Sequence, residues 1–193
     1  MKKIHGLSYE ITIFLTAITI LSALIPACTS APTVQETGKL LTRHYTSQEY
    51  SLEIDYHEGW HVDFTADGII FATVPSLNVS RDGGAGFGIL MLSSDEVEDN
   101  FRAGEEAGLD QVFRAFGKAS DTRIEDIVDR PIGGITGKSA RIVIEADTQM
   151  AGEMSIVKRG DNYLFFVTVV KPPADRDQYE PVFDAMYESV VFN

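Results

Sequence analysis

The sequence predicts an α+β domain in which a mainly antiparallel sheet is covered by helices. The composition is that of an ordinary globular protein, with 44% hydrophobic and 23% charged residues in a chain of 193. Segments with the two-residue period of strands outnumber segments with the helical period. Consecutive strands are joined by short turns, which favours antiparallel pairing because parallel neighbours need long crossovers.

The folded region opens with strand-like segments. Alternation is strict around Trp60, Val62 and Phe64, which we expect to share one face of a strand. Asp67-Gly68 predicts a hairpin turn, and Arg81–Gly86 predicts a glycine-rich loop that could line the mouth of a ligand site. The predicted strands of this part are, in order, residues 50–56, 60–64, 69–74 and 87–92.

One long helix is predicted next, over residues 95–118. Ser93 and Glu96 have the spacing of a capping box, and acidic residues suit the positive end of a helix. Gly104 and Gly108 are interpreted as a kink or a close approach to the sheet. The apolar stripe of this helix comprises Leu109, Val112, Phe113 and Phe116.

The strand period then returns before a second helix. The predicted strands are residues 124–132, 138–147, 150–159 and 163–170. The last of them is apolar on both faces, so we expect it at the centre of the sheet. A second amphipathic helix carries Tyr179, Val182, Phe183 and Met186, and a short strand at 190–192 closes the chain.

The first 27 residues predict a targeting segment. Two lysines precede a 15-residue apolar run at 11–25, which is shorter than the roughly 20 residues of a membrane span. The sequence Ile25-Pro26-Ala27-Cys28 resembles the lipobox of bacterial lipoproteins, which implies acylation of the Cys28 thiol. Ordinary secretion with cleavage near Ala31 and an uncleaved anchor stay open as alternatives.

The chain is therefore divided into three parts: a lipoprotein signal peptide at 1–27, a flexible tether at 28–40 and a globular domain at 41–193. The tether has no hydrophobic period, and about 150 residues are enough for a core without disulfides.

Charge and cysteine content exclude several functions. The net charge is −13, which argues against nucleic acid and against electrostatic docking on an anionic membrane. Removal of residues 1–27 leaves 14 basic and 28 acidic residues, and the segments 95–118 and 174–188 carry eight of the fourteen net negative charges. A single cysteine excludes an intrachain disulfide and any multi-cysteine metal site.

Three segments carry a resemblance to the PsbP-like domains, a family that comprises the extrinsic photosystem protein and many bacterial lipoproteins. They are Tyr50–Trp60, with its Gly-Trp turn, Ile135–Ile142 and Tyr179–Phe192. The resemblance covers residues 41–193. It implies a PsbP-like α/β/α sandwich and the lipid-anchored setting of the bacterial branch, and it transfers no catalytic residue.

The strongest catalytic motif is His57-Glu-Gly-Trp-His61, a formal H-E-x-x-H. Zinc binding by this motif requires a helix, whereas the flanking alternation predicts a turn and a strand, which would separate the histidines by roughly 13 Å. We therefore interpret the motif as a turn, and a zinc hydrolase through His57 and His61 is the weakest hypothesis.

The remaining motifs are also interpreted as structural. Gly133–Ser139 resembles a phosphate loop, but the first glycine is misplaced and a strand follows. Residues 82–88 lack a dinucleotide fingerprint, and no G-x-S-x-G occurs. The seven acidic residues between Asp95 and Asp110 lack a calcium-loop pattern and are expected on a solvated helix face.

The sequence thus favours a non-enzymatic, lipid-anchored module of the cell envelope. It would face outside the cytoplasm, bind a membrane through a palmitate-type lipid on Cys28, and bind a protein partner or support an envelope complex. Cys28 is the only predicted site residue; no catalytic, metal, cofactor or nucleic-acid site is predicted. The alternative is a solute-binding or envelope-stress lipoprotein with a small-ligand cleft near residues 81–88.

Overall fold

A computed structural model describes residues 40–65, 68–75, 79, 83–104, 107–120, 122–144 and 150–193. Its strands are β1 (Arg43–Ser47), β2 (Leu52–Tyr56), β3 (His61–Phe64), β4 (Gly68–Ala72), β5 (Gly84–Ser93), β6 (Thr122–Ile132), β7 (Ile135–Ile144), β8 (Ala151–Arg159), β9 (Asn162–Lys171) and β10 (Val191–Phe192). Its helices are α3 (Ser94–Phe101), α4 (Leu109–Ser120) and α5 (Arg176–Ser189), with the 3-10 turn η2 (Pro173–Asp175) before α5.

The strands form two antiparallel sheets. The larger sheet has seven strands in the order β3-β4-β5-β9-β8-β7-β6, and the smaller one has the order β1-β2-β10. Strand β9 lies in the middle of the larger sheet, as its apolar sequence predicts. Adjacent residues of β9 enter opposite cores, since Phe165 packs with α3 and α4 while Phe166 packs with α5.

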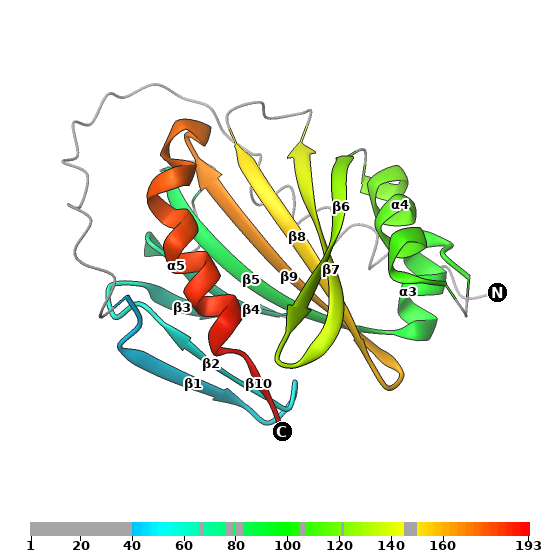
Figure 1. Ribbon diagram of the computed structural model, residues 1–193, viewed down its shortest axis with the longest axis horizontal. Helices are drawn as coiled ribbons and strands as arrows, with labels where there is room; N and C mark the ends of the chain where they lie inside the picture. Colours follow the sequence, from blue (N-terminus) through cyan, green and yellow to red (C-terminus); the bar gives the residue numbers. More distant parts are fainter. Residues whose placement is uncertain are drawn as a thin grey trace.

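Helices cover both faces of the larger sheet, which confirms the predicted α+β class and the α/β/α sandwich. One core contains Phe87 and Met186 and joins α5 and the small sheet to the larger sheet. The second core contains Phe113 and Met154 and lies under α3 and α4. Figure 1 shows α5 crossing the near face of the sheet, with α3 and α4 beside its β6 end.

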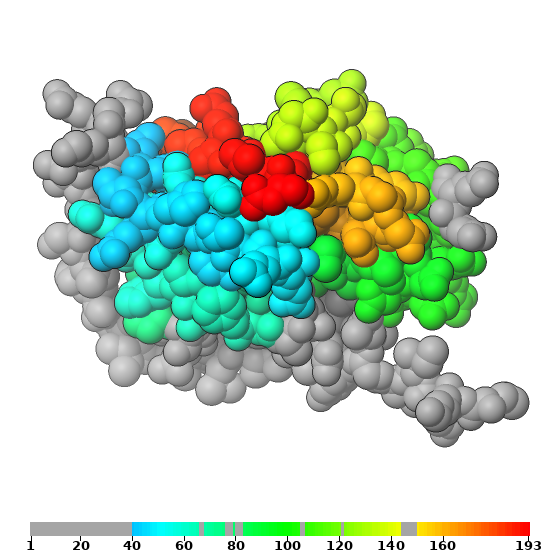
Figure 2. Space-filling view, turned by 90° about the horizontal axis from the view of Figure 1, so that it is seen from below, coloured from blue at the N-terminus to red at the C-terminus, as the bar shows by residue number. Residues whose placement is uncertain are grey.

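The small sheet closes one end of this sandwich. Leu52 and Ile54 of β2 are fully buried and hold the sheet against the main core. Figure 2 shows its strands, in blue and cyan, next to the C-terminal residues and the β8–β9 turn. Arg159 of β8 joins these segments because its guanidinium donates to the backbone oxygens of Ser51 and Asn193.

Three sequence predictions were wrong in detail. The helix expected over 95–118 is two helices, because Arg102 adopts a left-handed φ of 55° and caps α3, and Gly104 follows with a φ of 83°. Strand β1 was missed because RHYTS has no clear apolar alternation. The expected loop at 81–86 is strand from Gly84 onward, where the missing side chain permits close packing: a Cβ would lie 2.3 Å from the Thr73 hydroxyl.

Other predictions agree with the structure. The Ser93 and Glu96 capping box is present at the start of α3, and the buried face of α5 contains Val182, Phe183 and Met186 as expected. Within the described ranges, no helix combines the length and the apolar character needed to cross a bilayer. The boundaries at 27 and 40 stay predictions, because residues 1–39 lie outside the described part of the chain.

Candidate functional site

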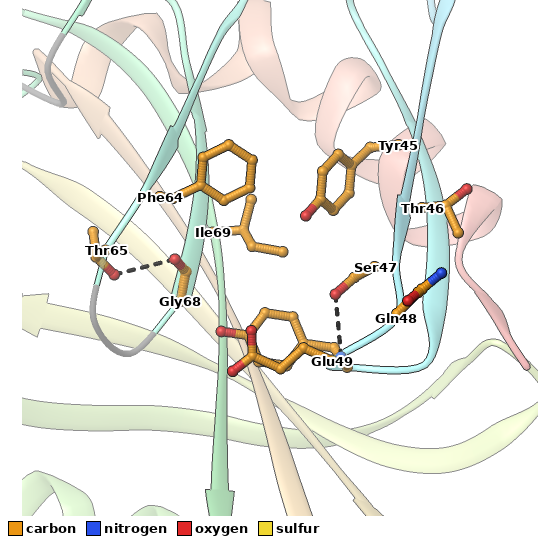
Figure 3. A pocket seen from close by; sticks show the side chains of 10 residues that line it. Tyr45, Thr46, Ser47, Gln48, Glu49, Phe64, Thr65, Gly68 and Ile69 are labelled. Carbon is orange, nitrogen blue, oxygen red and sulfur yellow. Dashed lines mark hydrogen bonds between the residues drawn. The ribbon is translucent and has the colours of Figure 1, made fainter.

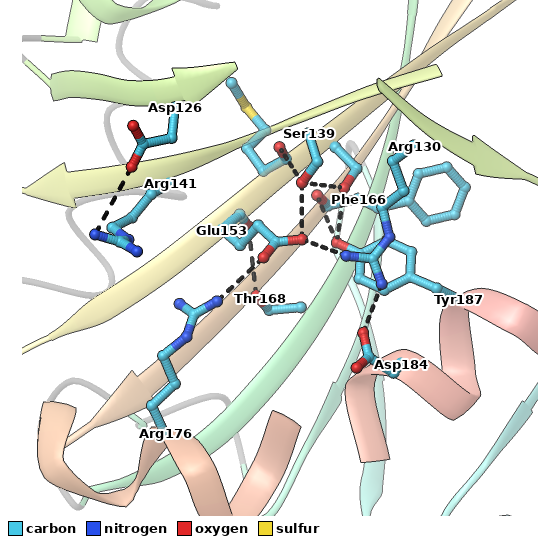
Figure 4. Close-up of polar contacts among 12 residues, drawn as sticks. Asp126, Arg130, Ser139, Arg141, Glu153, Phe166, Thr168, Arg176, Asp184 and Tyr187 are labelled. Carbon is cyan, nitrogen blue, oxygen red and sulfur yellow. Dashed lines mark hydrogen bonds and ion pairs between the residues drawn. The ribbon is translucent and has the colours of Figure 1, made fainter. Parts of the chain in front are cut away.

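The most extensive polar cluster of the described residues lies on the sheet face beside α5 (Figure 4). Strands β6, β7 and β8 supply Arg130, Ser139 and Glu153, and α5 supplies further charged groups. The antiparallel register creates the cluster, since Ser139 lies opposite Ser155 and Glu153 lies opposite Arg141. Directly paired residues of neighbouring strands point to the same face of a sheet.

Glu153 is the centre of this cluster. Its Oε1 accepts hydrogen bonds from Arg130 Nη1 at 2.7 Å and from the Ser139 hydroxyl at 2.7 Å. Its Oε2 accepts from Arg176 Nη2 at 3.1 Å. The second nitrogen of Arg130 donates to Asp184 Oδ1 at 2.7 Å, so that this guanidinium joins β8 to α5.

Arg130 also covers a buried tyrosine. Its Cζ lies 3.9 Å from the ring centre of Tyr187, a cation–π geometry. Burial by itself would lower the pKa of Arg130, but the hydrogen bond to Asp184 and nearby negative charge, including Glu153, outweigh it and raise that pKa. Arg130 therefore stays charged and holds the edge of the sheet on α5.

The Tyr187 hydroxyl lies beneath that guanidinium and is buried. Ser155 Oγ donates to it at 3.2 Å, and the phenol lies 3.5 Å from the Phe166 carbonyl oxygen. Burial is the main cause that raises the pKa of Tyr187, and the negative charge of Glu153 adds to it. Tyr187 is thus a neutral phenol that serves as a packing and hydrogen-bonding group.

The charges of this cluster are balanced. Two guanidinium groups, from Arg130 and Arg176, face two carboxylates, from Glu153 and Asp184. Glu153 already accepts from three donors, so it is poorly placed to take a proton from a substrate. The arrangement fixes side chains for packing and recognition, and it lacks the free base that general acid–base chemistry requires.

The structure separates the two histidines of the H-E-x-x-H motif as the sequence predicts. His57 lies in the turn after β2, where its Nδ1 accepts from the Gly59 backbone N–H at 3.0 Å. His61 is the first residue of β3. Among the residues that the structure describes, no group of three or more His, Cys, Asp and Glu side chains is arranged to hold a metal ion.

The other motifs take the structural roles expected of them. Gly133 and Gly134 form the β6–β7 turn with positive φ, and Gly137 belongs to β7, so no phosphate loop opens a helix there. The acidic residues of α3 are exposed, as predicted. Residues 84–88, the described part of the segment expected near a ligand cleft, form the first half of β5, so the glycine-rich loop is shorter than expected and the cleft itself stays a prediction. Cys28 and residues 81–82 lie outside the described residues.

Sequence reasoning missed the Glu153 cluster. A signal was present in retrospect, since Gly137, Ser139 and Arg141 alternate with buried Ala140 and Ile142 and therefore share a polar face. Nothing local indicated that Glu153, 23 residues from Arg130, would meet that face.

Comparison with known proteins identifies the fold. No protein-family model and no curated protein matches the sequence. Cyanobacterial PsbP (CyanoP) from Synechocystis sp. PCC 6803 superimposes with a TM-score of 0.53 at 12% identity, over 84% of this chain and 98% of that one. The Ran-binding protein Mog1p of Saccharomyces cerevisiae superimposes with a TM-score of 0.51 at 7% identity, over 79% and 96%. The domain therefore has the PsbP-like fold, in agreement with the resemblance seen in the sequence.

Proposed function

We propose that this protein is a non-enzymatic binding module of the cell envelope, held to a membrane by a lipid on Cys28, with its domain outside the cytoplasm. The observation that carries the proposal is the charge-balanced cluster around Glu153, which has the chemistry of a rigid recognition surface. The fold supports it, because Mog1p is a Ran-binding protein and so uses this architecture to bind a protein.

The face beside α5 is the candidate docking surface. Val128 of β6 pairs with Ser139, so it shares the face of the Glu153 cluster, and it is 55% exposed. Arg141 lies opposite Glu153, and its side chain is 60% exposed. Arginine is enriched at interface centres, and here Arg130 is fixed by Glu153 and Asp184 while Arg141 is exposed on the same face.

Site-directed photocrosslinking tests this face. We expect a crosslinker at Val128 or Arg141 to capture one partner in a defined ratio, while a crosslinker at exposed Arg114 on α4 captures none. The substitution Arg141→Glu should abolish the Val128 crosslink and leave the fold intact. Equal capture from Arg114, or a crosslink that survives Arg141→Glu, would contradict a docking role for this face.

Lipid attachment is tested separately. Membranes labelled with palmitate should contain labelled protein, and the label should be lost in Cys28→Ala. The strong negative charge of the mature chain then acts against adsorption of the domain on an anionic bilayer. Label retained by Cys28→Ala would show that the anchor is elsewhere.

A further inference from the structure

A pocket of about 300 Å³ lies between the β1–β2 turn and the β3–β4 hairpin, away from the Glu153 cluster (Figure 3). It is lined by the end of β1, the residues that follow it, and the residues on either side of the β3–β4 turn. The described chain begins at residue 40, before the N-terminal end of β1. The pocket lies at the C-terminal end of β1 and at the turn that follows it. The pocket is therefore displaced from the point at which the predicted tether joins the domain.

Aromatic rings form two walls of the pocket. Tyr45 and Phe64 lie side by side in Figure 3, with ring centres 6.0 Å apart and planes tilted by 47°. The buried ring of Phe71 supports Tyr45 from behind in an edge-on contact at 5.9 Å. Phe64 is 69% exposed, although its position in the alternating β3 sequence predicts a buried side chain. Phe64 therefore presents an exposed ring to a ligand, beside a half-buried tyrosine that Phe71 holds in place.

The polar lining combines hydroxyl and amide side chains with one carboxylate. Glu49 is an exposed carboxylate at the edge of the pocket, and within the described ranges no cation pairs with it. Gln48, the preceding residue, also lines the pocket, and its side-chain amide includes an oxygen that can accept a hydrogen bond. The hydroxyl of Thr65 is committed as a donor to the Gly68 carbonyl, and Ser47 Oγ is committed as an acceptor from the Tyr50 backbone N–H.

We propose that this pocket binds a guanidinium group, as presented by an arginine side chain of a peptide or protein. A planar guanidinium stacks on aromatic faces and donates up to five N–H groups, which matches two rings beside a carboxylate and an amide oxygen. A quaternary ammonium also binds aromatic rings, but it has no N–H to donate to Glu49 or Gln48. The net negative charge of the domain further favours a cation.

Titration with N-acetyl-arginine amide, followed by amide NMR spectra of the protein, tests the proposal. Among the described residues, we expect saturable shifts confined to 45–50, 64–65 and 68–69. N-acetyl-citrulline amide has nearly the same shape without the charge and should bind at least about threefold more weakly, as expected for loss of an exposed cation–π and ion-pair contact. Equal binding of the citrulline compound, or shifts scattered over the surface, would overturn the proposal.

Variants separate the pocket from general electrostatics. Glu49→Gln and Phe64→Ala should each weaken binding about two- to fivefold, because each removes one exposed contact. Glu98→Gln on α3 makes the same change in net charge far from the pocket and should leave binding unchanged. An equal loss in Glu98→Gln, or no loss in Glu49→Gln, would refute the site. Tetramethylammonium that bound as tightly as the arginine compound would overturn the choice of guanidinium.

This inference goes beyond the proposed docking face and is independent of it. The small probes report on the pocket whether or not a partner crosslinks at Val128, and absence of such a crosslink leaves the pocket result unaffected. Both Phe64 and Glu49 are exposed, so their substitution should preserve the fold, which the fluorescence of buried Trp60 can verify.

Discussion

Substitution of Glu153 should destabilise the domain more than its position near the surface suggests. The side chain is 19% exposed and accepts three hydrogen bonds, two of them from guanidinium groups. Bonds to charged groups contribute about 1.5–3 kcal/mol each when solvent is excluded, and less where, as here, the arginines are about one quarter exposed. Arg130 keeps its hydrogen bond to Asp184 when Glu153 is replaced. The groups that lose a hydrogen-bond acceptor are therefore mainly Arg176 and Ser139.

We therefore expect Glu153→Leu to lower the free energy of unfolding by about 2–3 kcal/mol and Glu153→Gln by about 1 kcal/mol, since glutamine still accepts one bond. The corresponding fall in Tm is about 5–10 °C for the leucine variant. Urea unfolding followed by Trp60 fluorescence is a direct assay, because Trp60 is the single tryptophan of the sequence and is buried. The centre of its ring lies 5.9 Å from the ring centre of Phe183 on α5.

A matched control is available on α5. Glu188 is exposed, and Glu188→Gln should change stability by less than about 0.5 kcal/mol. A double-mutant cycle between Glu153→Gln and Arg176→Gln should give a coupling of about 1 kcal/mol. If both Glu153 variants unfold within about 0.5 kcal/mol of the unmodified protein, the role assigned to this cluster is refuted.

The hydrogen bond to Asp55 raises the pKa of His44 above 6.5. The contribution of this contact to folding stability is therefore fully present below pH 6.5 and is lost as the pH rises through the pKa of His44 in the folded protein. NMR titration of the His44 ring should show this raised pKa, and Asp55→Asn should lower it. Phe87→Ala should cost about 3–5 kcal/mol by calorimetry because Phe87 is fully buried, and a cost under 1 kcal/mol would contradict its place in the core. Gly137→Ala should cost about 1–3 kcal/mol in urea unfolding, since its Cβ would lie 2.5 Å from Val157 Cγ1; unchanged stability would contradict this strand packing.

Local patterns were sufficient to predict most of the elements. The apolar run 163–170 predicted the central strand, because only a strand covered on both faces tolerates such a sequence. The capping box at Ser93 predicted the start of α3, since both of its bonds form within four residues. Where prediction failed, a residue was ambiguous by itself: Gly84 suits a mobile loop as well as a strand packed against Thr73.

The sites depended on contacts between distant segments. Glu153 meets Arg130 because strand register and α5 bring them together, and the polar alternation of β7 does not specify that partner. Phe64 followed the period of a buried strand, but β3 is at the end of the sheet order and the ring stays exposed beside Tyr45. Periodicity states which residues share a face; it does not state what covers that face.

The sequence by itself determined the α+β class, the central strand and the acidic helices, because hydrophobic period and capping are properties of a few neighbouring residues. It also predicted Cys28 as a lipid site and the division at residues 27 and 40, which stay predictions. The tertiary structure decided that the chain forms two sheets, that Glu153 is neutralised by two arginines, and that Tyr45, Glu49 and Phe64 border one pocket. These outcomes depend on the register and packing of segments distant in the sequence, whose contact energies no local pattern encodes.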